Sequence, residues 1–364
     1  MRTLVIMFSI LFCSSVLSAQ DLTTRADGGN RKAMVGEKIG LTDVTINYNR
    51  PGVKGREGKI WNGLVHTGFK DLGFGTSKAA PWRAGADENT TITFSTDVFI
   101  NQQPLPAGTY GFFIAMGEGN ATIIFSKNYT SWGSFFYDPK EDALRVNVNT
   151  LPLSENVEWL KYEFMDQTEN SAVIALEWEK LKVPFTVSVD YVKTQMESFR
   201  NELRSNKGFN SSAWVQAAEF AAANNFLNEA DTWSAYAINA VFVGQKNFKT
   251  LSTRAMILQK KGDTKGADQL MKEAMPLGSM LDLHQYGKQL VEQKKYPEAM
   301  EVFKMNATKH PGQFTTYVGL MRGYKVNGDN KNALKNGLLA LPLAPDKLNK
   351  DALEKMIDDL KKGN

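Results

Sequence analysis

Four positive charges lie within ten residues in the first half of the chain. They are Arg50, Lys54, Arg56 and Lys59, and the same stretch holds a proline and three glycines. A glycine-rich basic loop can offer backbone N–H groups and guanidinium forks to a carboxylate, sulfate or phosphate. A solvated turn whose arginines pair with neighbouring carboxylates would have the same composition. We therefore take Arg50, Lys54 and Arg56 as candidate ligand-binding residues, with both interpretations open.

Three further candidates are aromatic or lie beside an aromatic residue. Trp82-Arg83 and Trp132 lie in segments that follow loops rather than strands. Aromatic rings on loops stack well on the faces of sugars, whereas buried tryptophans at the corners of a sandwich are a common structural alternative. Trp82, Arg83 and Trp132 therefore join the candidate site for a glycan or an anionic ligand.

Acid–base chemistry has one candidate pair. Glu177 and Glu179 flank Trp178, so on a strand both carboxylates would point to the same face. Two neighbouring carboxylates are what glycoside hydrolysis uses. We expect instead that both glutamates face solvent while Trp178 points inward, and we predict no catalytic residue.

Other chemistries have no matching motif. The three histidines, His66, His284 and His310, are scattered over the chain without metal-ligand spacing. There is no Gly-x-Ser-x-Gly nucleophile elbow, and Gly73-Phe-Gly75 is too short for a phosphate loop. We predict neither a metal site nor a cofactor.

The N-terminus has the pattern of a secretory signal peptide. Arg2 precedes an apolar run from residue 4 to 17, and Ser18-Ala19 ends it with small residues. We expect residues 1–19 to be removed, together with Cys13, the single cysteine. The sequence therefore predicts an exported protein, periplasmic or extracellular in a Gram-negative bacterium. No segment has the length of a transmembrane span.

Period-two alternation of β-branched and aromatic residues dominates residues 32–190. Such runs, bounded by glycine, proline, asparagine and aspartate, occupy 44–50, 91–94, 110–115, 122–125, 144–148, 160–164, 172–178 and 185–189. They come without helical patterns between them, which predicts an all-β antiparallel sandwich, jelly-roll-like in connection.

Helical periodicity replaces this pattern from Tyr191 onward. Residues 191–210 are predicted to hold a connecting helix and residues 211–364 tetratricopeptide-like repeats. Ala267, Ala299 and Ala333 recur at 32 and 34 residues, in positions where two helices of such a repeat approach closely. A weaker copy precedes them around Ala230, and the segment 353–360 is expected to close the array. An unrelated helical bundle is the alternative.

The β half also resembles a known family. The residues that carry the resemblance are 40–56, Trp82-Arg-Ala-Gly-Ala86, 90–94, 106–110, Trp132-Gly133 with 137–139, and 176–179 with 183–185. Together they resemble the bacterial family called domain of unknown function 2911. The resemblance implies an exported domain of the kind common in Bacteroidetes, often followed by helical repeats, and it implies no accepted activity. This chain departs from the pattern in a longer segment 66–81 and in Asp87, where asparagine is usual.

These observations favour an exported, non-enzymatic binding or scaffold protein. The β half would bind a glycan, a peptide or a partner, and the helical repeats would contact a protein. An enzyme acting on an envelope or extracellular polymer is the alternative, and it requires the candidate residues to converge on a carboxylate such as Asp87 or Asp138. A third possibility is a β half that merely caps the helices. The net charge of +4 is spread without a dense basic stripe, so nucleic acid is not an expected partner.

Overall fold

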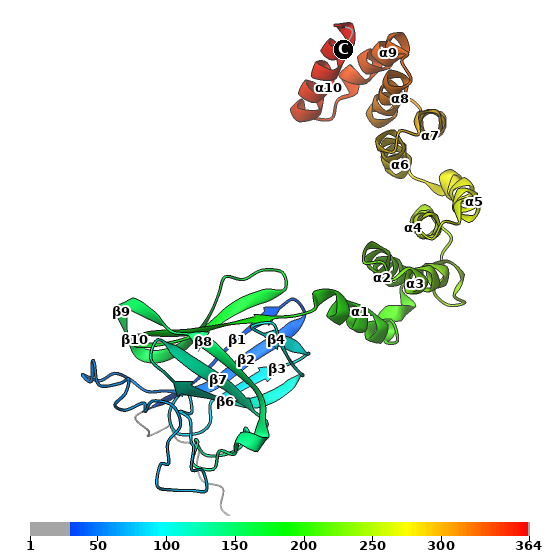
Figure 1. Ribbon diagram of the computed structural model, residues 1–364. Helices are drawn as coiled ribbons and strands as arrows, with labels where there is room; N and C mark the ends of the chain where they lie inside the picture. The colour runs from blue at the N-terminus through cyan, green and yellow to red at the C-terminus, as the bar shows by residue number, and fades with distance from the viewer. Residues whose placement is uncertain (1–29, 363–364) are drawn as a thin grey trace, which may run out of the picture. The chain divides into compact units, whose positions relative to one another are not determined.

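The computed structural model describes residues 30–362, which form two compact units divided between Tyr191 and Val192 (Figure 1). We call them the β unit and the helical unit, and each has its own hydrophobic core. The predicted signal peptide and Cys13 lie outside the described residues. Among residues 30–362, no helix is long and apolar enough to cross a membrane.

The β unit consists of two packed antiparallel sheets, which confirms the predicted sandwich. The six-stranded sheet has the order β1 (Arg31–Ile39), β2 (Thr42–Arg50), β3 (Thr91–Phe94), β6 (Gly108–Met116), β7 (Asn120–Ser126) and β8 (Asp142–Asn149). The four-stranded sheet has the order β5 (Gln103–Leu105), β4 (Val98–Ile100), β10 (Ser171–Ser188) and β9 (Leu151–Met165). A short 3-10 helix, η1 (Pro139–Glu141), precedes β8. In the larger sheet, neighbouring strands are consecutive in the chain except at β3 and β6, because β4 and β5 belong to the other sheet. This topology is simpler than that of a jelly roll.

Alternation along the strands sends side chains of both sheets into one core. On β2, Val44, Ile46 and Tyr48 are buried while the residues between them are more exposed. Phe112 of the larger sheet and Phe185 of the smaller sheet have ring centroids 5.5 Å apart. Because this core is continuous, the sandwich is a rigid frame for the segments that connect its strands.

A long segment without regular strands, residues 51–90, connects β2 to β3 and carries most of the predicted site residues. Short backbone pairings hold it against the sandwich. Trp82 exchanges two hydrogen bonds with Ile114 of β6, at 2.9 and 2.8 Å, and Gly52 pairs with Trp159 of β9. The sandwich therefore positions this segment even though the segment has little secondary structure of its own.

Strand β10 differs from the expectation at two points. It is one continuous strand where the sequence predicted two, and its pairing with β9 is irregular on both sides of Glu179, which has φ +51°. An irregularity of this kind bends a strand and redirects its side chains. Glu177 and Glu179 are each only 6% exposed, so the prediction that they face solvent is wrong.

Helix pairs make up the helical unit, as the repeat spacing predicted. Helix α1 (Tyr191–Glu202) and the 3-10 helix η2 (Asn206–Phe209) come first. The pairs are α2 (Ser211–Ala223) with α3 (Leu227–Asn239), α4 (Phe248–Lys260) with α5 (Thr264–Ala274), α6 (Met280–Glu292) with α7 (Tyr296–Lys309), and α8 (Phe314–Val326) with α9 (Asn330–Ala340). The 3-10 helices η3 (Met275–Leu277) and η4 (Leu341–Leu343) follow α5 and α9, and α10 (Lys347–Lys361) closes the array (Figure 1).

Small residues sit where these helices approach one another most closely. Ala230, Ala299 and Ala333 are fully buried at the predicted repeat positions. Gly287 of α6 has no room for a side chain, because a Cβ there would lie 2.4 Å from the ring of Phe303 on α7. Close helix approach at small residues, with an aromatic ring filling the neighbouring groove, is the packing that the tetratricopeptide-like repeats predicted.

Candidate functional site

A cavity of about 320 Å³ opens in the β unit beside residues 82–87, and we call it the Trp82 cleft. Its lining includes three candidate residues, Arg56, Trp82 and Arg83. Asp87 and Trp178 line it as well. Three of the six predicted site residues are therefore brought together, next to one of the two carboxylates that the sequence singled out.

Tryptophan rings form part of this cleft. Trp82 and Trp178 pack with Trp61 in one cluster, with ring centroids 5.7 to 6.1 Å apart. The indole N–H of Trp82 donates to the carbonyl of Gly85 at 3.1 Å. The buried Nε1 atoms of Trp61 and Trp178 have no acceptor among the described residues. An unpaired buried donor costs about 1–3 kcal/mol, so the cluster holds unused hydrogen-bonding capacity.

The guanidinium of Arg83 is fixed from two sides. Its Nη1 donates to the main-chain carbonyl of Asp87 at 2.7 Å, and its Cζ lies 5.1 Å from the centre of the Phe135 ring. Gly133, at φ +59°, passes so close that a Cβ there would lie 2.6 Å from the Cζ of Arg83. Burial lowers the pKa of Arg83, and the charge of Asp87 opposes that shift. The group stays cationic at neutral pH because an arginine begins from a very high value.

Arg56 is held by the segment that precedes it. Its Nε donates to the carbonyl of Val53 at 2.9 Å and its Nη2 to the carbonyl of Gly52 at 2.7 Å. Neither Arg56 nor Arg83 forms an ion pair with any carboxylate among residues 30–362. The Trp82 cleft thus contains two partly buried cations whose charges are not matched by ion pairs.

The loop that carries Trp82 and Arg83 has a strained backbone. Ala84 and Asp87 adopt φ +51° and +57°, which non-glycine residues rarely do and which costs on the order of 1 kcal/mol each. Two buried hydrogen bonds hold the carbonyl of Ala84, one from the hydroxyl of Tyr162 at 2.7 Å and one from Thr90 at 3.1 Å. The sandwich core therefore enforces this loop conformation.

The other three candidates lie outside the Trp82 cleft. The Nε of Arg50 donates to the carbonyl of Leu160 at 2.8 Å, and Lys54 lies 5.7 Å over the ring of Trp159. Trp132 is 54% exposed and does not line the cavity. The carboxylate of Asp138 accepts a hydrogen bond from the backbone of Lys140 and caps η1. The convergence of all the candidate residues on one carboxylate, which the enzyme alternative requires, is therefore not what the structure shows.

Glu177 and Glu179 do not form an acid–base pair. Glu177 is held by Lys182 at 2.8 Å and Lys161 at 3.1 Å. Burial opposes the ionisation of Glu177, but the hydrogen bonds and charges of the two lysines outweigh it, so its pKa is lowered. Glu179 instead accepts a hydrogen bond from the backbone N–H of Gly58. In the described part of the chain, no group of three or more His, Cys, Asp or Glu side chains is placed to hold a metal ion.

A larger cavity in the β unit was missed by sequence reasoning. It measures about 830 Å³ and is lined by four asparagines, Asn101, Asn120, Asn147 and Asn149, among other residues. We call it the asparagine cleft. Its asparagines come from β7, from β8 and from the turn between β4 and β5, so no local sequence motif joins them.

The helical unit has a smaller groove between three helices, which we call the α6–α8–α10 groove. Its volume is about 230 Å³, and its lining includes His284 from α6, Val318 and Arg322 from α8, and Met356 from α10. The buried Nε of Arg322 has no acceptor among the described residues. The groove combines an apolar wall with Arg322, which forms no ion pair with a carboxylate among the described residues. It is therefore a candidate site of contact with a protein.

The stability of the helical unit should depend on pH through His284. Burial, followed by the charges of Arg322 and Lys288, lowers the pKa of His284 from 6.5 to about 4. Between these values the unfolded chain binds a proton that the folded chain does not. The free energy of unfolding is therefore expected to fall by about 1–3 kcal/mol between pH 7 and pH 4 through this group.

Urea unfolding of the full chain at several pH values, followed by circular dichroism, measures this effect. The His284→Gln variant should show a shallower fall than the wild type, because carboxylates that titrate in the same range are common to both proteins. Equal slopes in the two proteins would contradict the assignment.

The β unit has a family match. Residues 30–187 match the family described as "Protein of unknown function (DUF2911)". Neither the family description nor the match assigns a reaction or a ligand. No match was found among curated proteins.

Solved structures of helical repeat proteins are similar to this chain. One is YrrB, described as a TPR protein with an unusual peptide-binding site, at 17% identity over 45% of this chain and 84% of that one, with a TM-score of 0.30. Another is the C-terminal part of a TPR repeat-containing protein from Cytophaga hutchinsonii, at 16% identity over 47% and 67%, with a TM-score of 0.35. MamA matches at 12% identity over 45% and 92%, with a TM-score of 0.32.

Proposed function

We propose that this chain, in which residues 30–187 form a DUF2911 domain and tetratricopeptide-like helices follow, is an exported, non-enzymatic binding protein. Its β unit would hold a ligand with an anionic group in the Trp82 cleft, and its helical unit would contact a protein partner. The observation that carries the proposal is the pair Arg56 and Arg83, two cations in one cleft without an ion-pair partner among residues 30–362.

The two cations carry a cost of desolvation. Taking a cation out of water is unfavourable unless an anion or several acceptors replace the lost hydration. Main-chain carbonyls satisfy part of each guanidinium, but they bring no net negative charge. A carboxylate, sulfate or phosphate of a ligand would supply that charge and match the planar fork of arginine. The Trp82 ring, which lines the same cleft, would contact an apolar part of the same ligand.

The geometry supports binding better than polymer hydrolysis. Asp87 contributes the only carboxylate among the described residues that line the Trp82 cleft, and its Oδ2 accepts a hydrogen bond from Asn30 at 3.1 Å. Hydrolysis of a glycosidic bond generally uses two carboxyl groups on opposite sides of that bond. A single carboxylate beside two arginines is better suited to orient a ligand that carries both an anion and a hydroxyl or amine.

Export rests on the sequence of residues 1–19, with a basic start, an apolar run and small residues at the end. A periplasmic or extracellular site of action in a Gram-negative bacterium is part of the proposal. For the helical unit, the α6–α8–α10 groove supports contact with a peptide that carries an acidic and an apolar side chain, because Arg322 and Met356 line the same cavity.

Two single substitutions in the full chain separate the two proposed contacts. Arrays of acidic and neutral glycans and peptides identify ligands of the wild type, and capture from envelope extract identifies protein partners. Arg83→Gln should weaken retention of acidic array ligands at least about tenfold and leave protein capture unchanged. Arg322→Gln should weaken protein capture and leave the retention of acidic array ligands unchanged. If neither variant changes either readout, or if the array shows no preference for acidic ligands, the proposed function is wrong.

A further inference from the structure

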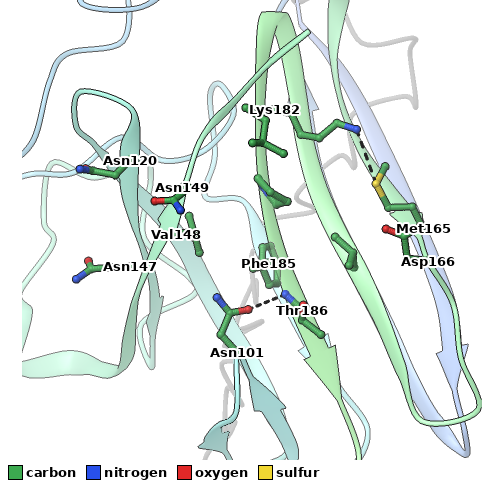
Figure 2. A pocket seen from close by; sticks show the side chains of 13 residues that line it. Asn101, Asn120, Asn147, Val148, Asn149, Met165, Asp166, Lys182, Phe185 and Thr186 are labelled. Atoms are coloured by element: carbon green, nitrogen blue, oxygen red, sulfur yellow. Dashed lines mark hydrogen bonds between the residues drawn. The ribbon is translucent and has the colours of Figure 1, made fainter.

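We propose that the asparagine cleft is a second binding site of the β unit, for a neutral ligand rich in hydroxyl groups, such as an oligosaccharide. This inference does not depend on the Trp82 cleft, since none of the asparagines involved lines that cavity. The asparagine cleft has a volume of about 830 Å³, within the range of roughly 300–1,000 Å³ that small-molecule sites occupy (Figure 2).

The walls of the cleft are strands and a tight turn. The chain leaves the six-stranded sheet at Asn149, the last residue of β8, and enters the four-stranded sheet at Leu151, the first residue of β9. β8 is the edge strand of its sheet, and β10 forms the opposite wall around Phe185 (Figure 2). Asn101 comes from the two-residue turn between β4 and β5, where its φ is +44°. Side chains on such elements are held in place more firmly than side chains on long loops.

Two of the asparagines are oriented by hydrogen bonds within the protein. The Oδ1 of Asn101 accepts from the backbone N–H of Thr186 at 2.8 Å (Figure 2), and the Oδ1 of Asn147 accepts from the hydroxyl of Thr122 at 2.7 Å. A backbone N–H is always a donor, so the orientation of the Asn101 amide is determined by chemistry. Asn101 therefore retains its NH₂ group as a donor, whereas the Thr122 hydroxyl can donate or accept and so leaves either end of the Asn147 amide available. Asn120 and Asn149 are exposed and add further donors and acceptors.

The charges of the cleft favour a neutral ligand. Lys182 lines it, but its Nζ is paired with Glu177 at 2.8 Å and lies 3.8 Å from the sulfur of Met165 (Figure 2). The exposed Asp166 is the single carboxylate among the described lining residues, and it can accept two hydroxyl groups of a sugar. Because the one cation is already paired, the cleft offers no unmatched positive charge to an anion.

Apolar atoms complete the match to a sugar ring. The apolar surface comes mainly from Leu151, which is 47% exposed, while Val148 and Phe185 belong to the sandwich core behind the cleft wall. Pyranose rings present C–H groups between their hydroxyls, so a mixed lining of amides and aliphatic groups is complementary to both. An extended peptide added along β8 would use main-chain groups and separate apolar pockets instead. The side-chain amides favour the sugar.

Calorimetric titration of the full chain with maltotriose, cellotriose, mannotriose and chitotriose tests this inference. We expect at least one of them to bind with a Kd in the millimolar range or below. In the Asn149→Ala variant, and separately in Asn120→Ala, that Kd should rise by about tenfold, the loss expected when a ligand hydroxyl loses its partner. Asn201→Ala is the matched control, since Asn201 is an exposed asparagine of α1 far along the sequence from the cleft residues.

Circular dichroism melts establish that each variant is folded. Three outcomes would overturn the inference. These are no binding by any of the four trisaccharides up to about 20 mM, equal affinity of the cleft variants and the wild type, or displacement of the sugar by an extended peptide that binds more tightly. The Arg83→Gln variant should bind the trisaccharide as the wild type does, even if it no longer binds acidic ligands. The two proposed sites are therefore tested independently.

Discussion

Replacing Phe303 with alanine is expected to lower the free energy of unfolding of the helical unit by about 3–5 kcal/mol. Phe303 is fully buried on α7, and its ring contacts helices on both sides. A Cβ at Gly287 of α6 would lie 2.4 Å from the ring, and Cβ atoms at Gly319 and Gly323 of α8 would lie 2.8 and 2.9 Å from it. Three glycines have thus made room for one ring, and its removal leaves a cavity between α6, α7 and α8.

Urea unfolding monitored by far-UV circular dichroism measures this loss. Phe209→Ala is the matched control, because Phe209 is 72% exposed in η2, and its truncation should change stability by less than about 0.5 kcal/mol. A change below about 1 kcal/mol in Phe303→Ala would show that the helices collapse onto the vacated space, contrary to the packing described here.

The second large effect concerns ligand binding. The double variant Arg56→Gln, Arg83→Gln is expected to bind an acidic ligand at least about 100-fold more weakly than the wild type, because two charge-assisted contacts of roughly 1.5–3 kcal/mol each are removed. Glutamine retains hydrogen-bonding capacity toward the nearby main chain, so the fold should persist. Lys59→Gln is the control, since it removes one exposed charge from the same segment without altering the cleft lining.

An Arg83→Lys variant distinguishes charge from geometry. Lysine keeps the positive charge but lacks the planar fork that donates to the Asp87 carbonyl and faces the Phe135 ring. Its affinity for the acidic ligand should lie between those of the wild type and Arg83→Gln. Affinity equal to that of the wild type would mean that a diffuse positive field, rather than the fixed guanidinium, attracts the ligand.

Much of the fold follows from local sequence patterns. The alternation in residues 44–50, 91–94 and 144–148 corresponds to β2, β3 and β8, and the recurring small residues mark the helix pairs. Strand β1 was missed because its residues are mostly exposed, so no apolar alternation marks it. The single strand β10 was expected as two because Glu179, Lys180 and Lys182 interrupt its apolar pattern after Trp178. The burial of Glu177 and Glu179 depends on Lys182 of the same strand, on Lys161 of β9 and on the backbone N–H of Gly58.

The two clefts differ in how far sequence could reveal them. Arg56, Trp82 and Arg83 stood out because each is a distinctive residue type in a distinctive segment, and the structure brings them together in the Trp82 cleft. Arg50 and Trp132 matched the same description, yet main-chain pairing and loop geometry place them elsewhere. The asparagine cleft is built from residues that are spread along the chain from Asn101 to Thr186. Its signal is spatial, and single-sequence patterns do not contain it.

The most direct test of the central claim compares one ligand with and without its charge. The tightest acidic glycan or peptide from the array, and its methyl ester, are titrated into the full chain by calorimetry. We expect the acid to bind at least about tenfold more tightly than the ester, and the Arg56→Gln, Arg83→Gln variant to lose this difference. Equal affinity for the acid and the ester, or an undiminished preference in the double variant, would contradict the proposal that the Trp82 cleft binds an anion.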